Sequence, residues 1–191
     1  VNENSIKTMF EEIVSIPIDD DISFSFQGVG EIRKNDVYGG YRISLSANFP
    51  PMKVPLKLDI TTGDKITPEA IEYSYPMMFS DGTLEIFAYN LETILAEKLE
   101  TVISRGDQNT RPRDYYDFIL SKLKGHEIDR DTLHKALSET AKKRDSGELI
   151  LQYRSIMEQV VKSTAMLQHW KTYQRDYEYA REIEFSLVCE T

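Results

Sequence analysis

The chain has 191 residues, of which 40% are hydrophobic and 29% charged, and its formal net charge is -9. This composition is typical of a globular protein with a sizeable core, and the acidic balance argues against a nucleic-acid footprint over the whole surface, although it leaves room for a local basic groove. The single cysteine, Cys189, excludes an internal disulfide and fits a reducing compartment. No apolar run reaches the roughly 18 residues of a membrane span, so we expect a cytoplasmic protein without a membrane partner.

The first half of the chain predicts one helix followed by strands. Apolar side chains recur at helical spacing at the start, and Pro17 ends that pattern. Alternating apolar and polar side chains then indicate strands. The predicted elements are a helix over residues 4–16, a strand over 21–27, two strands over 31–49 with a turn at Gly39 and Gly40, a strand within 51–64, and a shorter one over 86–89.

From Asn90 the period becomes helical, with Asn90 itself as the N-cap. The expected segments are a helix after Asn90, a loop at "SRGDQNT", a helix from Pro112 to about Lys124, helices over 130–144 and 147–165, and a mostly helical end. Strands followed by helices predict an α+β fold: a mostly antiparallel sheet with packed helices, then a helical C-terminal region. The expected division is 1–125 and 126–191.

The first candidate site lies in "LKLDITTGD". Asp59 occupies the polar face of an apolar strand, and Asp64 follows a glycine turn. A carboxylate on a strand can ligate Mg²⁺, which prefers carboxylate and phosphate oxygens. The alternative is a solvent-facing strand residue followed by a turn aspartate.

The second candidate is Lys98 in "LAEKLET". It lies at the edge of the apolar stripe of its helix, where it can neutralise a phosphate or a neighbouring carboxylate. The alternative is a lysine that buries its stem and keeps its ammonium group in water. We expect the adjacent Glu97 and Glu100 to be ordinary solvated residues.

The third candidate is "RPRDYYD", residues 111–117, at the start of the helix after Pro112. Asp114 and Asp117 are i, i+3 neighbours on one face, and Arg113 is placed to pair with Asp117. The helix dipole accounts for Asp114. Asp117 precedes the apolar "FIL" and is expected at the rim of the core, where an acid needs a partner. Lys98 is the predicted partner.

A tyrosine-rich tail contains Tyr173, Tyr177 and Tyr179. These rings are able to stack nucleobases, and packing between helices is the alternative that we favour. The sequence has no Walker-type phosphate loop, no zinc-ligand spacing and no G-x-S-x-G elbow.

Taken together, the three motifs resemble the AbiEii/AbiGii family of nucleotidyltransferase toxins, which carries D-I-x-x-G-D on a strand, a lysine on the next helix, and R-x-(K/R)-D-x-x-D after it. The matching residues are Asp59 to Asp64, Lys98, and Arg111 to Asp117. The resemblance is clearest over about residues 40–125. It implies a polymerase-β-like fold and Mg²⁺-dependent nucleotidyl transfer from an NTP to an RNA acceptor such as tRNA, with a separately encoded antitoxin as partner.

The resemblance also implies roles for these residues. Asp59 corresponds to a metal-binding carboxylate that can take the acceptor's proton, and Lys98 faces the triphosphate. Asp114 and Asp117 position Lys98 and the nucleotide. Arg113 lies near phosphate or pairs with Asp117, and Asp64 shapes its turn or binds nucleotide.

The chain departs from the family pattern in one important respect. The family's other two metal carboxylates come from an earlier Gly-Ser followed by D-x-D, and this motif is absent. The run Asp19–Asp21 follows Ile18 in a predicted loop and has no Gly-Ser before it. Thr61 and Thr62 are a minor departure, at a position that often carries glycine. We expect the chain to be a fragment that begins just after this motif and has little or no activity by itself.

Two other functions remain open. The first is a non-catalytic module that binds a nucleotide, RNA or a protein on the same scaffold, which the missing motif favours. The second is a metal-dependent nuclease that uses Asp59, Asp114 and Asp117, which is the weakest because no further strand acid and lysine occur at short spacing.

Overall fold

The computed structural model describes residues 2–32 and 39–190, and it confirms the predicted α+β class. The chain forms two compact units, residues 1–64 and residues 65–191, called here the sheet unit and the helical unit. This division is different from the predicted one after residue 125, which stays a prediction. The two units are treated separately below.

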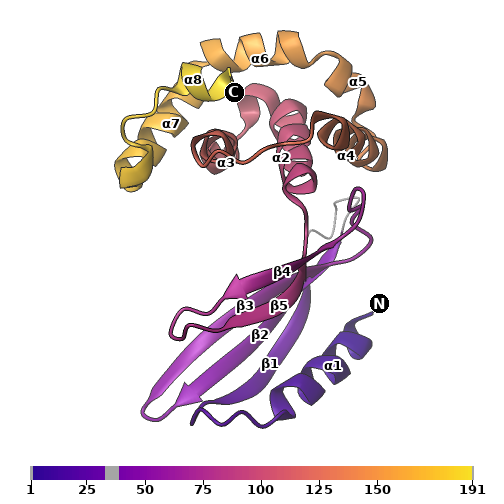
Figure 1. Ribbon diagram of the computed structural model, residues 1–191, viewed down its shortest axis with the longest axis vertical. Helices are drawn as coiled ribbons and strands as arrows, with labels where there is room; N and C mark the ends of the chain where they lie inside the picture. Colours follow the sequence, from indigo (N-terminus) through magenta and orange to yellow (C-terminus); the bar gives the residue numbers. More distant parts are fainter. Residues whose placement is uncertain (1, 33–38, 191) are drawn as a thin grey trace. The chain divides into compact units, whose positions relative to one another are not determined.

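The sheet unit consists of one helix and a three-stranded antiparallel sheet in the order β1-β2-β3 (Figure 1). Its elements are α1 (Glu3–Ser15), β1 (Ser23–Ile32), β2 (Gly40–Phe49) and β3 (Met52–Thr61). The predicted helix and the strands expected over 21–27, after Gly40 and within 51–64 are confirmed. The separate strand expected from Glu31 is not seen among the described residues, because β1 runs on to Ile32. The turn was expected at two glycines, but Gly40 is already the first residue of β2, and residues 33–38 lie outside the described residues.

The core of the sheet unit lies between α1 and one face of the sheet. Ile6 and Phe10 of α1 pack against Ile43 and Leu45 of β2. Because side chains alternate along a strand, Arg42 and its cross-strand neighbour Asp59 point to the opposite face. The first pair of the β2–β3 ladder requires glycine, since a Cβ at Gly40 would lie 2.7 Å from the Ile60 carbonyl oxygen.

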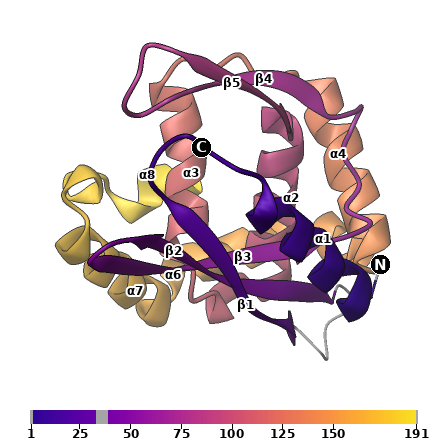
Figure 2. The ribbon, with the colours of Figure 1, turned by 90° about the horizontal axis from the view of Figure 1, so that it is seen from below.

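The helical unit begins with a hairpin of β4 (Ile71–Pro76) and β5 (Thr83–Ala88), which Figure 2 shows as a twisted two-stranded ribbon. The strand expected at residues 86–89 is therefore longer and starts earlier, and β4 is an element that the sequence analysis missed. The hairpin exposes large apolar side chains on both faces. They are Ile71, Tyr73, Tyr75, Met77, Met78, Phe79, Leu84, Ile86 and Phe87.

Helices make up the rest of this unit. They are α2 (Leu91–Arg105), α3 (Pro112–Leu123), α4 (Arg130–Lys143), α5 (Gly147–Leu151), α6 (Tyr153–Lys162), α7 (Thr164–Asp176) and α8 (Phe185–Cys189), with short 3-10 turns at Gly106–Gln108 and Glu178–Ala180. The helices expected after Asn90, from Pro112 and over 130–144 are confirmed, and Asn90 caps α2 through Thr93 N. The single helix expected over 147–165 is wrong. The chain breaks at Gln152 and again at Ser163, whose hydroxyl caps α7.

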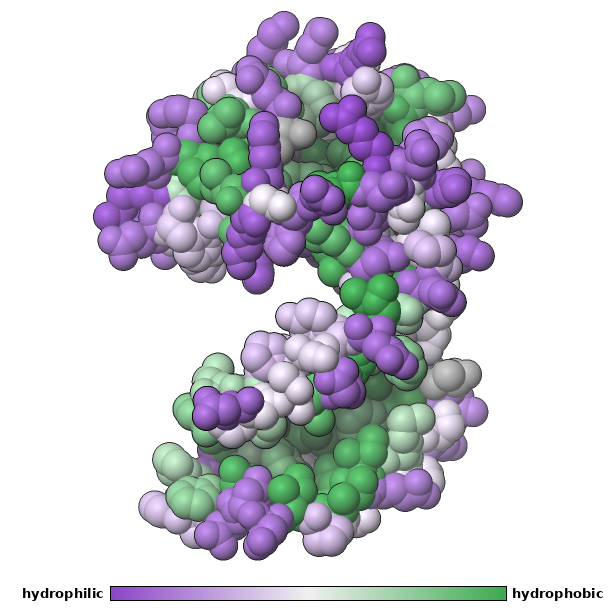
Figure 3. Space-filling model, in the orientation of Figure 1, coloured by the Kyte–Doolittle hydropathy of each residue, from purple (hydrophilic) through white to green (hydrophobic). Residues whose placement is uncertain are grey.

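The core of the helical unit gathers α3, α6, α7 and α8 around Trp170, whose indole N–H donates to the Ile183 carbonyl at 2.8 Å. Figure 3 shows polar side chains over much of the visible surface of these helices, with apolar side chains between them. Glu100 is not the solvated residue expected from the sequence. It is buried on α2 and accepts from Arg144 at 2.5 Å, so an ion pair joins α2 to the end of α4.

Candidate functional site

Helices α2 and α3 bring three of the predicted site residues together. The Lys98 ammonium nitrogen lies 2.7 Å from an oxygen of Asp117 and 3.3 Å from an oxygen of Asp114. These side chains are between 13% and 25% exposed, so the group lies at the rim of the core. The predicted pairing of Lys98 with Asp117 is confirmed. We call this group the lysine–aspartate cluster.

The start of α3 explains why the two acids face Lys98. Pro112 occupies the first turn of the helix, where its missing N–H costs nothing. Asn109, fully buried before the helix, accepts from the Arg111 N–H at 2.8 Å through its side chain. Since this bond fixes the turn into α3, it sets the rotation of the helix and with it the direction of Asp114 and Asp117.

The lysine–aspartate cluster carries two carboxylates and one ammonium group, so its formal charge is -1 at neutral pH. A lysine ammonium group has three N–H donors. Two of them point at Asp114 and Asp117, which leaves one for a further acceptor such as a phosphate oxygen. The geometry therefore holds Lys98 in one orientation and still leaves it able to bind an anion.

A group of tyrosines adjoins this cluster. Burial first, and then the nearby Tyr179 and Asp117, raise the pKa of Tyr116. Burial and a hydrogen bond to Tyr179 raise the pKa of Tyr173, on which Asp117 and Arg113 act in opposite directions. The charges of Arg113 and Asp117 on α3 are thus close enough to these rings to shift the pKa of a tyrosine hydroxyl.

The remaining predicted site residues, Asp59 and Asp64, belong to the sheet unit. Both carboxylate oxygens of Asp59 accept from the Arg42 guanidinium, at 2.7 Å and 2.8 Å, and this bond raises the pKa of Arg42. Asp64 accepts from the Thr61 hydroxyl at 2.5 Å across Gly63, whose φ is +77°. Asp64 thus takes part in closing the turn.

The residues around Asp59 do not fit a magnesium ion in the arrangement that the structure shows. Magnesium needs carboxylate or phosphate oxygens in a near-octahedral set. Both oxygens of Asp59 are engaged by Arg42, and no group of three His, Cys, Asp or Glu side chains able to hold a metal occurs within residues 2–32 and 39–190. No reaction step is therefore assigned to a metal at this position.

The sequence analysis missed one pair that supports the site. Arg144 contacts Glu100, which lies two residues after Lys98 on α2, and it also donates to the Thr101 hydroxyl at 3.1 Å. This contact fixes α2 against α4. No local pattern reveals it, because 43 residues separate the Arg144 and Thr101 side chains along the chain.

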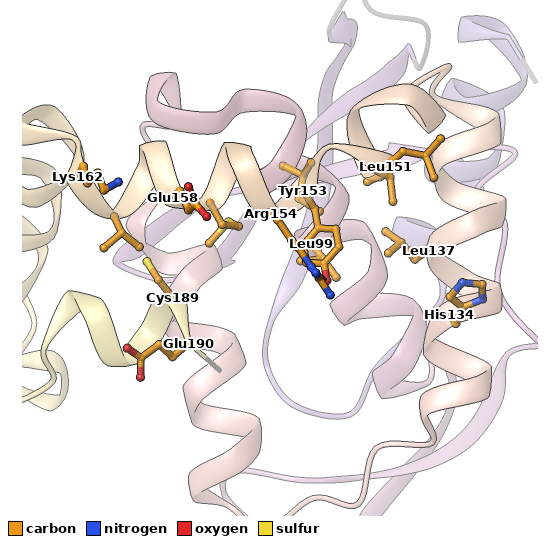
Figure 4. Close-up of a pocket in the computed structure, with 14 residues that line it drawn as sticks. Leu99, His134, Leu137, Leu151, Tyr153, Arg154, Glu158, Lys162, Cys189 and Glu190 are labelled. Carbon is orange, nitrogen blue, oxygen red and sulfur yellow. Dashed lines mark hydrogen bonds between the residues drawn. The ribbon is translucent and has the colours of Figure 1, made fainter.

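The helical unit contains an apolar groove of about 830 Å³, drawn in Figure 4. Leu99, Leu137 and Leu151 line it, and so does Arg154, whose guanidinium donates to the Tyr153 hydroxyl at 3.0 Å. None of the predicted site residues lines this groove.

Comparisons with known proteins give one match. No curated protein and no solved structure matches the chain significantly. Within the described part of the chain, no helix is long and apolar enough to cross a membrane. The family model described as "Nucleotidyl transferase AbiEii toxin, Type IV TA system" matches residues 2–188, nearly the whole chain. The chain therefore belongs to the AbiEii nucleotidyltransferase toxin family of type IV toxin–antitoxin systems.

Proposed function

We propose that this toxin transfers a nucleotidyl group from an NTP to an RNA acceptor such as tRNA, and that its cognate antitoxin counteracts this activity. The observation that carries the proposal is Lys98, held at 2.7 Å from Asp117 and 3.3 Å from Asp114 in the motif order of a nucleotidyltransferase family. An oriented ammonium group with one free donor is suited to an anionic substrate group.

In this proposal each residue of the lysine–aspartate cluster has a separate task. Lys98 binds a triphosphate oxygen and stabilises the charge that develops as pyrophosphate leaves. Asp114 and Asp117 are positioning residues that keep the ammonium group in place. Arg113, exposed one turn before Asp117, adds a cation for a phosphate of the acceptor strand.

The reaction is a displacement at the α-phosphorus. A hydroxyl oxygen of the acceptor forms the new P–O bond, the bond to the β-phosphate oxygen breaks, and pyrophosphate leaves with the electron pair. The hydroxyl proton passes to solvent water.

The second candidate is a binding module that recognises a nucleotide or RNA without catalysis. The 191 residues contain no Gly-Ser pair and hence no Gly-Ser…D-x-D motif, and Asp59 is engaged by Arg42. Both facts favour binding over transfer for this stretch of chain.

The test uses the full-length gene product with α-labelled NTPs and total RNA, with Mg²⁺ or with EDTA. We expect Lys98→Ala to lower labelling of RNA by roughly 100-fold or more. Lys171→Ala, at an exposed lysine of α7, should leave it unchanged. Asp59→Ala tests the role that the family resemblance gives to Asp59.

Three outcomes separate the candidates. Equal labelling by all variants would show that the assigned roles are wrong. Absence of labelling by the unmodified protein, together with Lys98-dependent binding of NTP, would support the binding module. Labelling that persists in EDTA would contradict dependence on Mg²⁺.

A further inference from the structure

Four tyrosines of the helical unit form one continuous aromatic surface, called here the tyrosine cluster: Tyr116 of α3, Tyr173 of α7, and Tyr177 and Tyr179 just after α7. Ring centroids are 4.8 Å apart for Tyr116 and Tyr179, 4.6 Å for Tyr173 and Tyr177, and 5.4 Å for Tyr177 and Tyr179. The hydroxyls of Tyr173 and Tyr179 lie 3.0 Å apart in a hydrogen bond. The rings are therefore held in place before any ligand arrives.

Packing between helices accounts for only part of this cluster. Tyr173 is buried among the core residues, and Tyr116 is partly buried beside them. Tyr177 and Tyr179, in contrast, are 46% and 54% exposed. An aromatic side chain held by other rings on one side and open to water on the other presents a surface for a planar ligand.

The charges next to the cluster favour a ligand with phosphate groups. Arg113, Tyr116 and Asp117 lie at i, i+3 and i+4 on one face of α3. Asp117 is bonded to Lys98, whereas Arg113 is exposed and has no ion-pair partner in the part of the chain that the structure describes. An arginine beside exposed aromatic rings is a combination that binds single-stranded nucleic acid.

The small positive charge next to the tyrosine cluster favours an RNA strand over a free nucleotide. The charge of Lys98 is already offset by two carboxylates, so Arg113 supplies the one uncompensated cation of the α3 face. A single-stranded RNA brings one phosphate charge per base, and stacking supplies most of its affinity. A free nucleotide brings only one base for the two exposed rings, Tyr177 and Tyr179.

We propose that the tyrosine cluster with Arg113 is a stacking platform for unpaired bases of the RNA acceptor, beside the lysine–aspartate cluster. Tyr177 and Tyr179 present the stacking faces, Tyr116 and Tyr173 support them, and Arg113 contacts the phosphate between bases. This inference rests on the proposed function for the identity of the acceptor. It adds where on this chain the acceptor strand lies.

The test measures binding of a short fluorescein-labelled single-stranded RNA to the full-length gene product by fluorescence anisotropy. Tyr177→Ala and Tyr179→Ala should each weaken binding about tenfold, and the Tyr→Phe variants should stay within about twofold, since phenylalanine retains the stacking face. Arg113→Gln should weaken binding and lower the salt dependence of log K by about 0.7. Affinity for labelled NTP, measured separately, should not change in the tyrosine variants.

The matched control is Tyr153→Ala on α6. Tyr153 is 45% exposed and lines the apolar groove. Its replacement therefore removes a similarly exposed ring that lies away from α3. We expect this variant to bind RNA normally. Unchanged RNA binding by both Tyr177→Ala and Tyr179→Ala would overturn the platform, and so would equal weakening by Tyr153→Ala.

Two results distinguish this proposal from the proposed function. If Lys98→Ala and unmodified protein both fail to label RNA while RNA binding depends on Tyr177 and Tyr179, transfer is contradicted and the platform stands. If labelling depends on Lys98 but neither labelling nor RNA binding responds to the tyrosine variants, the platform is wrong and transfer stands. The thermal melting of each variant, followed by the fluorescence of Trp170, confirms that it is folded.

Discussion

The sheet unit and the helical unit each hold a charged group from the candidate motifs, in contrasting surroundings. Arg42 and Asp59 lie on the open face of the sheet, 47% and 45% exposed. Lys98, Asp114 and Asp117 lie at the rim of a helical core and are at most 25% exposed. Water screens the first pair and competes for its hydrogen bonds, whereas the second group is held by its surroundings. Ion pairs of similar length in the two units are therefore expected to contribute differently to the free energy of unfolding.

The strongest test of this contrast is the most buried ion pair of the helical unit. We expect Arg144→Met to lower the free energy of unfolding of this unit by about 3–5 kcal/mol, because it leaves the Glu100 carboxylate, 4% exposed, without its partner. Urea titration followed by Trp170, the single tryptophan of the chain, reports this unit directly. The double variant Glu100→Leu/Arg144→Met should recover most of the loss. A single variant as stable as the parent would contradict the role of burial.

A smaller loss is expected in the lysine–aspartate cluster. Lys98→Met removes the cation between two partly buried acids and should cost roughly 1.5–3 kcal/mol by the same titration. Replacing Asp114 and Asp117 with asparagine in the Lys98→Met background should restore stability without restoring function. A loss in the triple variant as large as in Lys98→Met would show that packing of the lysine stem, and not charge, is responsible.

The sheet pair is expected to contribute least among the three ion pairs. Arg42→Ala should leave the denaturation midpoint of the sheet unit, followed by amide hydrogen exchange of β2 and β3, within experimental error. A clear loss of protection along this ladder would show that the bidentate contact holds the strands together and would remove the contrast between the units.

The last prediction concerns Cys189 and is confined to alkaline pH. Burial, and then the nearby Glu190, raise the pKa of this thiol from 9.0 to about 12. A group whose pKa is raised by folding contributes stability below its unfolded pKa, and this contribution is lost as the pH rises from 9.0 toward 12. Cys189→Ala should therefore flatten the alkaline end of the stability profile. In the native protein, iodoacetamide should modify Cys189 more slowly than it modifies a free thiol.

The parts of the fold that could be predicted are those with a local signal. Asn90 before an apolar stripe predicted the start of α2, and Pro112, suited to a first helical turn after a polar loop, predicted α3. Strand β4 was missed although Ile71, Tyr73 and Tyr75 alternate with polar residues, because the run is short and ends at a proline. The break at Ser163 escaped because a serine in a helical pattern is not by itself a stop signal.

In the candidate site, too, only the contacts with a local sequence signal could be predicted. The pairing of Lys98 with Asp117 was predictable because an acid before an apolar run needs a partner and the preceding helix supplies one. The contacts of Arg144 with Glu100 and of Arg42 with Asp59 join segments distant in sequence, and their register depends on how the elements pack. Chemical pattern alone could not show that Asp59 is engaged by an arginine.

The β4–β5 hairpin has a practical consequence for work on this protein. Its tip carries Met78, which is 83% exposed, more than Met52 (59%), Met77 (51%) or Met9 (48%), whereas Met166 is buried in the helical core. Peroxide converts accessible methionines to polar sulfoxides. Stored or stressed samples should therefore gain oxygen first at Met78, and peptide mass mapping would reveal a chemical change there while the core is still intact.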